Sequence, residues 1–169
     1  MSIPAGQFQL RAGDEEVGDM YQRILLALDG SDVAEQALPY AVIQAERFGA
    51  ELILLRVVEP FPLVRGLSQG DLARIRDQTQ EWARSYLEGV AKTAIERGVP
   101  VEMATVEGRP NEVILQFAET NQVDLIVICT RGRSGLSRWL MGSVADRVVR
   151  GAQVPILLVR AAATEQPQG

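Results

Sequence analysis

Histidine is absent from this sequence of 169 residues, and cysteine occurs once, as Cys129. The usual zinc sites and any Ser-His or Cys-His catalytic pair require these residues, so the sequence excludes both kinds of site. A single cysteine also excludes an intramolecular disulfide and fits a reducing compartment. Most hydrolase mechanisms are therefore removed.

Long apolar runs are also missing. No stretch approaches the roughly 18–20 apolar residues that a membrane span requires, and residues 1–20 lack the basic and apolar regions of a secretory signal. We therefore expect a cytoplasmic protein with no membrane partner. The net charge of −5 argues against a nucleic-acid partner, because such binding needs an extended basic surface.

The residues that are present indicate one globular domain with a full-sized core, since 47% of them are hydrophobic. Five apolar runs, each typical of a buried strand, alternate with amphipathic helical patterns. The runs cover residues 23–28, 51–58, 101–106, 124–129 and 154–159, and the third alternates with polar residues as an edge strand would. This order predicts a Rossmann-like α/β fold, a five-stranded parallel sheet with helices on both faces.

Residues 21–160 form the predicted domain, between a flexible arm of residues 1–20 and a flexible tail of residues 161–169. Within the first helix, Asp32 and Glu35 have the spacing of a capping box, and Pro39 predicts a kink. In the long helix of residues 71–97, we expect Trp82 and Tyr86 to pack on the sheet rather than bind a ligand.

The stretch from Asp124 to Val144 is the most informative. It predicts a buried strand, a loop rich in Gly, Ser and Arg, and a helix that opens at Gly142-Ser143. Such a unit binds anions, because unpaired N–H groups and the positive end of the helix dipole converge there. Three arginines, with no acidic residue between Asp124 and Asp146, reinforce the expectation of a phosphate; they are Arg131, Arg133 and Arg138.

Asp29 follows the first strand directly, as the loop of arginines follows the fourth. In parallel sheets ligands bind beyond the carboxyl ends of the strands, where the strand order reverses. If the first and fourth strands are neighbours, Asp29 and the loop face one crevice. The alternative is that Asp29 serves only the Asp-Gly turn.

The chain resembles the universal stress protein family over residues 22–160. The resemblance rests on ILLALDGSDVAEQAL, on LILLRVVEP, and above all on CTRGRSGLSRWLMGSVADRVVRGAQVPILLV. ATP-binding members of that family are similar in a spacing of Gly, two residues, Gly, nine residues, and Gly-Ser or Gly-Thr. Here Gly132 and Gly142-Ser143 match the spacing, whereas Cys129 stands in the position of the first glycine.

The resemblance implies ATP as the ligand, with Mg²⁺ left open, and a homodimer formed through the strand of residues 154–159. The implied binding residues are Ala27, Asp29, Val57, Cys129, Arg131, Gly132, Arg133, Ser134, Gly142, Ser143 and Val144. Ala27 and Val57 would contact adenine through main-chain atoms, and Asp29 would meet the ribose or the phosphates. We expect Cys129 to be buried and inert rather than redox-sensing.

Three functions remain open at this point. The first is an ATP-binding regulatory module of the stress response, and the second is an interaction protein that dimerises with an empty site. The third is a slow ATPase in which Asp29 positions water or Mg²⁺; it is the least favoured, because no general base lies beside Ser143 in the sequence and the GK[ST] of a P-loop is absent.

Overall fold

The structure is a computed structural model that describes residues 20–60, 68–130 and 142–162. The predicted five-stranded parallel sheet is confirmed, with the strand order β3-β2-β1-β4-β5. The third apolar run therefore lies at an edge, as its alternation predicts. The strands are β1 (Arg23–Leu28), β2 (Glu51–Val58), β3 (Val101–Glu107), β4 (Leu125–Thr130) and β5 (Ile156–Arg160).

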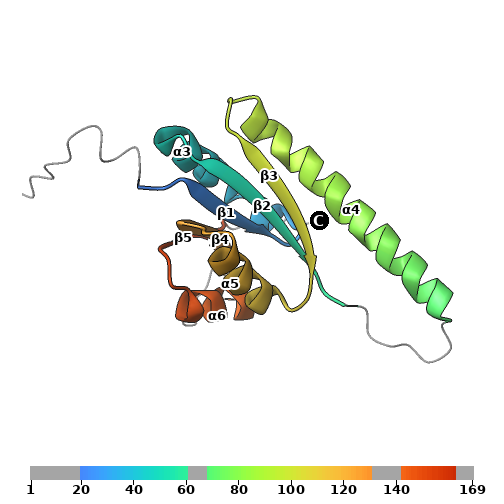
Figure 1. Ribbon diagram of the computed structural model, residues 1–169. Coiled ribbons are helices and arrows are strands. Elements are labelled where there is room, and N and C mark those ends of the chain that lie inside the picture. Colours follow the sequence, from blue (N-terminus) through green and yellow to red (C-terminus); the bar gives the residue numbers. More distant parts are fainter. Residues whose placement is uncertain (1–19, 61–67, 131–141, 163–169) are drawn as a thin grey trace, which may run out of the picture.

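Helices cover both faces of the sheet (Figure 1). One face carries α2 (Asp32–Glu35), α3 (Leu38–Phe48) and α4 (Gln69–Ile95), and the other carries α5 (Pro110–Thr120) and α6 (Ser143–Gly151). The residues of β1 alternate between two buried clusters, with Ile24, Leu26 and Leu28 in one and Leu25 and Ala27 in the other. Burial on both sides explains why the parallel strands read as continuous apolar runs.

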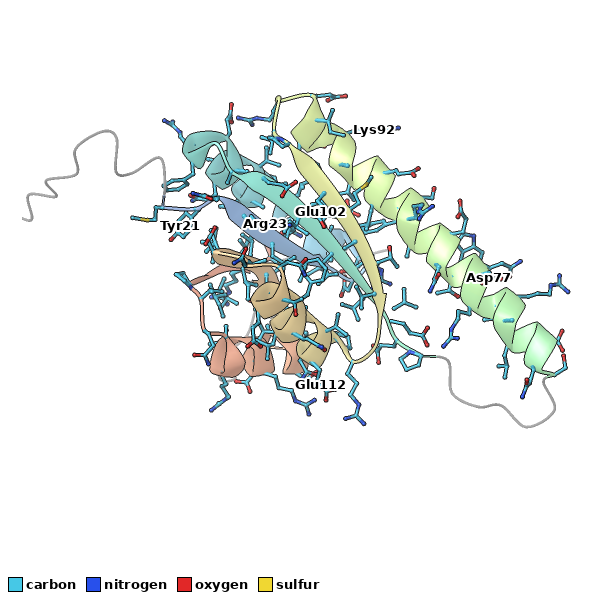
Figure 2. The ribbon with its side chains drawn as sticks, viewed as in Figure 1. Tyr21, Arg23, Asp77, Lys92, Glu102 and Glu112 are labelled. Carbon is cyan, nitrogen blue, oxygen red and sulfur yellow. The ribbon has the colours of Figure 1, made fainter. Side chains whose placement is uncertain are left out.

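The start of β1 is fixed by a carboxylate from the beginning of β4. Asp124 accepts hydrogen bonds from the backbone N–H groups of Gln22 and Arg23, at 2.8 and 2.9 Å. The Arg23 guanidinium in turn bonds Glu102 of β3 at 2.6 Å; both residues are labelled in Figure 2. These contacts hold the amino-terminal ends of the strands together.

The first helical segment differs from the sequence expectation in two respects. The N-cap is Ser31, whose hydroxyl accepts a hydrogen bond from Ala34 N at 3.2 Å, so the expected capping box of Asp32 and Glu35 is wrong. The helix also breaks into α2 and α3 rather than kinking. Pro39 lies in the first turn of α3, where its missing N–H costs no hydrogen bond.

The aromatic expectation on α4 is wrong for Trp82, which is 73% exposed. The buried residues of α4 all come from its second half, beginning at Ala83. The first half of this helix runs beyond the sheet (Figure 1). Tyr86 does pack against the core, with part of its surface exposed. The predicted stripe is buried at Val90 and Ala94, whereas Trp82 lies off the buried face, beside the buried Ala83.

The carboxyl-terminal boundary also moves. β5 begins at Ile156 rather than at Val154, and its end extends by one residue to Arg160. Ala161, expected in the tail, is buried and donates its N–H to Thr130 O, and Ala162 N bonds the side chain of Gln36. The remaining tail and the expected arm, except residue 20, lie outside the described residues. No helix of the described residues is long and apolar enough to cross a membrane.

Candidate functional site

The strand order reverses between β1 and β4, which pair directly at Ile24↔Leu125 through Leu26↔Val127. The chain leaves β1 toward α2 on one face and, after β4, reaches α6 on the other. Such divergence opens a crevice at the carboxyl ends of the two strands. The first and fourth strands are therefore neighbours, which is the condition under which Asp29 and the loop after the fourth strand would face one crevice.

A cavity of about 460 Å³ occupies this crevice. Its size falls within the range of small-molecule sites. The floor is apolar and comes from β1, β2, β4, α5 and α6; it is formed by Ala27, Leu55, Val57, Ile114, Ile128 and Ala145, which all belong to one buried cluster. A flat apolar ring is the kind of group that such a floor accommodates.

One side of the cavity is the amino terminus of α6. Gly142 is the N-cap and has no side chain to bond the first N–H groups, unlike Ser31 at α2 and Ser68 at α4. Gly142, Ser143 and Val144 all line the cavity. The uncapped N–H groups and the positive end of the helix dipole therefore lie against it, and together they favour an anionic ligand.

The other side is the turn that follows β1. Asp29 Oδ1 accepts hydrogen bonds from Ser31 N at 2.9 Å and from Ser31 Oγ at 2.6 Å, and Gly30 adopts φ +81°. Asp29 thus does serve its turn, as the alternative interpretation held. Because it is exposed and lines the cavity as well, the two roles are compatible.

Cys129 at the end of β4 is half-buried, so the expectation of a buried side chain is wrong in degree. It packs against the core beneath α2 and α3 and also lines the cavity. Burial raises the pKa of its thiol, and hydrogen bonding from the backbone only partly offsets that rise. The thiolate is therefore disfavoured, which agrees with an unreactive cysteine.

Comparison with known proteins gives this site its context. The sequence model of the universal stress protein family matches residues 20–160. The universal stress protein MJ0531 of Methanocaldococcus jannaschii is 38% identical over 142 residues, which cover 84% of each chain. The chain belongs to the universal stress protein family.

Solved structures agree with this assignment. That of MJ0577 superposes with a TM-score of 0.69 at 29% identity, covering 86% of this chain and 99% of the other. A universal stress protein in complex with cAMP superposes with a TM-score of 0.63 at 26% identity, covering 84% of this chain and 98% of the other.

In the present chain, many of the predicted binding residues lie around one cavity. Those that line it are Ala27, Asp29, Val57, Cys129, Gly142, Ser143 and Val144. The predicted residues Arg131, Gly132, Arg133 and Ser134, and the neighbouring Arg138, lie outside the described residues. Residues more than a hundred positions apart thus meet at one edge of the sheet.

Sequence reasoning missed Arg56, Glu59, Thr130 and Ile114, which also line the cavity. A signal for Arg56 was present, since it is the one charged residue within the apolar run LILLRVV. A cation inside a strand run needs a reason, because burying it without partners is costly. For Ile114 no signal existed, because its position depends on how α5 packs.

Proposed function

We propose that this chain binds an adenine nucleotide, ATP, in the cavity at the carboxyl ends of β1 and β4, and acts as a cytoplasmic regulatory module of the stress response. The observation that carries the proposal is the union of an apolar floor with an uncapped helix terminus in one cavity. A nucleotide has the matching parts, a flat base and an anionic phosphate chain. The related universal stress protein that was solved with cAMP supports this ligand class.

The proposed contacts follow the chemistry of the lining. The base lies on the apolar floor, where Ala27 and Val57 contribute main-chain atoms. The phosphates meet the N–H groups of Ser143 and Val144 and the Ser143 hydroxyl. The Asp29 carboxylate accepts from a ribose hydroxyl or contributes one ligand to a Mg²⁺ ion that the phosphates hold. Gly132, Arg131, Arg133 and Ser134 complete the phosphate side in this proposal.

A thermal-shift titration with ATP, ADP and AMP tests the proposal. ATP at a hundred times its dissociation constant stabilises a binding protein by about 2.7 kcal/mol. For a domain of this size each kcal/mol raises Tm by about 2–4 °C, so we expect a rise of about 5–11 °C. A wild-type chain whose Tm stays constant in millimolar ATP would refute the proposal.

Two substitutions at Ser143 separate lost binding from lost folding. Ser143→Asp places a carboxylate in the first turn of α6, where it stabilises the helix dipole but repels phosphate. We expect the ATP-free variant to melt no lower than the wild type and to show no shift with ATP. Ser143→Ala, which keeps the N–H groups, should retain a reduced shift.

We also propose that two copies associate through β5. This strand pairs with β4 on one side and forms the edge of the sheet, and its Leu158 is 42% exposed. An apolar edge strand pairs readily with its symmetry mate. Light scattering over a range of concentrations should give the mass of a dimer for the wild type and of a monomer for Leu158→Lys. A monomeric wild type would contradict this proposal.

A further inference from the structure

The carbonyl group of Val57 lies just past the end of a hydrogen-bond ladder. Along β2 the peptide groups alternate in direction, so that Glu51 N bonds Gln22 O before β1, and Leu52 N bonds Pro100 O before β3. Val57 has the parity of Glu51, and its peptide groups therefore face the side of β1. The ladder of β1 and β2 ends one residue earlier, at Leu28↔Arg56, because the chain turns away at Gly30.

The Arg56 side chain donates a hydrogen bond to this carbonyl oxygen. Its Nη1 donates to Val57 O at 3.0 Å, and its guanidinium lies over Gly30, where Nη2 is 3.5 Å from the position of an added β carbon. Among the described residues no carboxylate pairs with Arg56, and the Val57 carbonyl is the one acceptor of its five N–H donors. The side chain is half-buried and lines the nucleotide cavity.

The charges around the guanidinium do not supply the missing acceptors. Asp29 and Glu59 also line the cavity, but the Oδ1 atom of Asp29 is engaged by Ser31, and neither carboxylate lies within 4.0 Å of Arg56. The free donors of this half-buried guanidinium are therefore available to a ligand in the cavity. The remaining donors lie beside the Val57 carbonyl, at the carboxyl end of β2 and at the cavity.

We propose that Arg56 sets the base selectivity of the cavity, so that it accepts 6-oxopurine nucleotides alongside adenine nucleotides. This inference rests on the proposed function. A base that reads the main chain of Val57 presents either an amino group or a carbonyl oxygen at position 6. The amino group of adenine must share Val57 O with Arg56, whereas the carbonyl oxygen of hypoxanthine or guanine accepts directly from the guanidinium.

ATP and ITP are the appropriate probes, because their bases differ only in the exchange of an amino group for an oxo group at position 6 and in the proton that N1 then carries. The measured quantity is the ratio of the dissociation constants for ITP and ATP, obtained by calorimetry. We expect wild-type protein to bind ITP within about tenfold of ATP. In Arg56→Met, which keeps an unbranched stem over Gly30, the ratio should rise by about tenfold, the loss expected for one hydrogen bond to a charged donor.

Two further variants make the test specific. Arg56→Lys keeps a charged donor and should retain most of the wild-type ratio. Arg74→Met removes an exposed arginine of α4 far from the cavity and should leave the ratio unchanged. Because the ratio compares two ligands on one variant, a general loss of stability cancels from it.

The outcomes distinguish the two proposals. If the wild type binds ATP and Arg56→Met has the wild-type ratio, the selectivity role of Arg56 is refuted while nucleotide binding stands. An equal change in Arg74→Met would also refute it, since it would reflect net charge alone. If the wild type binds neither nucleotide, the proposed function fails, and the inference fails with it.

Discussion

Gly108 connects β3 to α5, and replacing it with alanine should destabilise the protein strongly. Its φ of +153° is rare for residues with a side chain, and an added β carbon would lie 2.6 Å from Cγ2 of Val113 on α5. Strain at such a backbone position costs about 1–3 kcal/mol. Overpacking costs about 1–3 kcal/mol more, because a β-branched side chain in a helix has one favoured rotamer and cannot swing away.

Gly151 of α6 provides a matched control. A β carbon there would lie equally close, 2.6 Å from Cδ1 of Leu115, yet Gly151 has no positive φ and Leu115 has a flexible end. We expect Gly151→Ala to change stability by less than about 1 kcal/mol, since gained helix propensity offsets the rearrangement. Gly108→Ala should cost about 2–6 kcal/mol, the sum of the two contributions.

Urea unfolding measures both variants, with the free energy taken from the midpoint and the slope. Adding Gly108→Ala to a Val113→Ala background should cost less unfolding free energy than adding it to the wild type. The difference is the cost of overpacking, and what remains is the backbone strain. The reasoning would be refuted if Gly108→Ala cost no more than Gly151→Ala, or if removing Cγ2 of Val113 recovered nothing. A loss of ATP affinity in Gly108→Ala should accompany the loss of stability, because α5 supplies Ile114 to the cavity floor.

The remaining predictions concern two half-buried side chains. Cys129→Gly should change ATP affinity by less than tenfold in a calorimetric titration, and a larger gain would mean that the cysteine obstructs the site. Alkylation of Cys129 in the wild type at pH 7 should be slower than that of a free thiol, because burial raises the pKa of the Cys129 thiol. Tyr86→Phe should leave the unfolding free energy unchanged or raise it by up to about 1 kcal/mol, because no described group accepts from the buried hydroxyl within 3.5 Å, although the Glu35 carboxylate lies near it. Burial and the nearby Glu35 raise the pKa of Tyr86, so wild-type stability should fall more steeply than that of Tyr86→Phe above about pH 10, where only the unfolded tyrosine ionises. A stability loss in Tyr86→Phe at pH 7 would instead indicate that the hydroxyl is bonded.

The site illustrates which residues the sequence could identify. Gly142 and Ser143 open a helix after a buried strand, and Asp29 ends another strand, so local rules marked each as a ligand position. The sequence patterns did not identify Arg56 as a site residue, because its role depends on where β1 ends and on the direction of the Val57 carbonyl. Cys129 was expected in the core, yet it lies at the end of β4, where the sheet gives way to the cavity.

The sequence by itself determined the strands, the helices and the parallel sheet, because apolar runs, helical periodicity and helix termini act over a few residues. It also located the edge strand β3, whose alternation records exposure on one side. Only the tertiary structure decided that β1 lies beside β4, which joins Asp29 to Ser143 across more than a hundred positions. It likewise decided that Trp82 is exposed, since the buried face of α4 runs through its neighbour Ala83 instead. Strand pairing and the meeting of elements are non-local, and no pattern within one segment carries them.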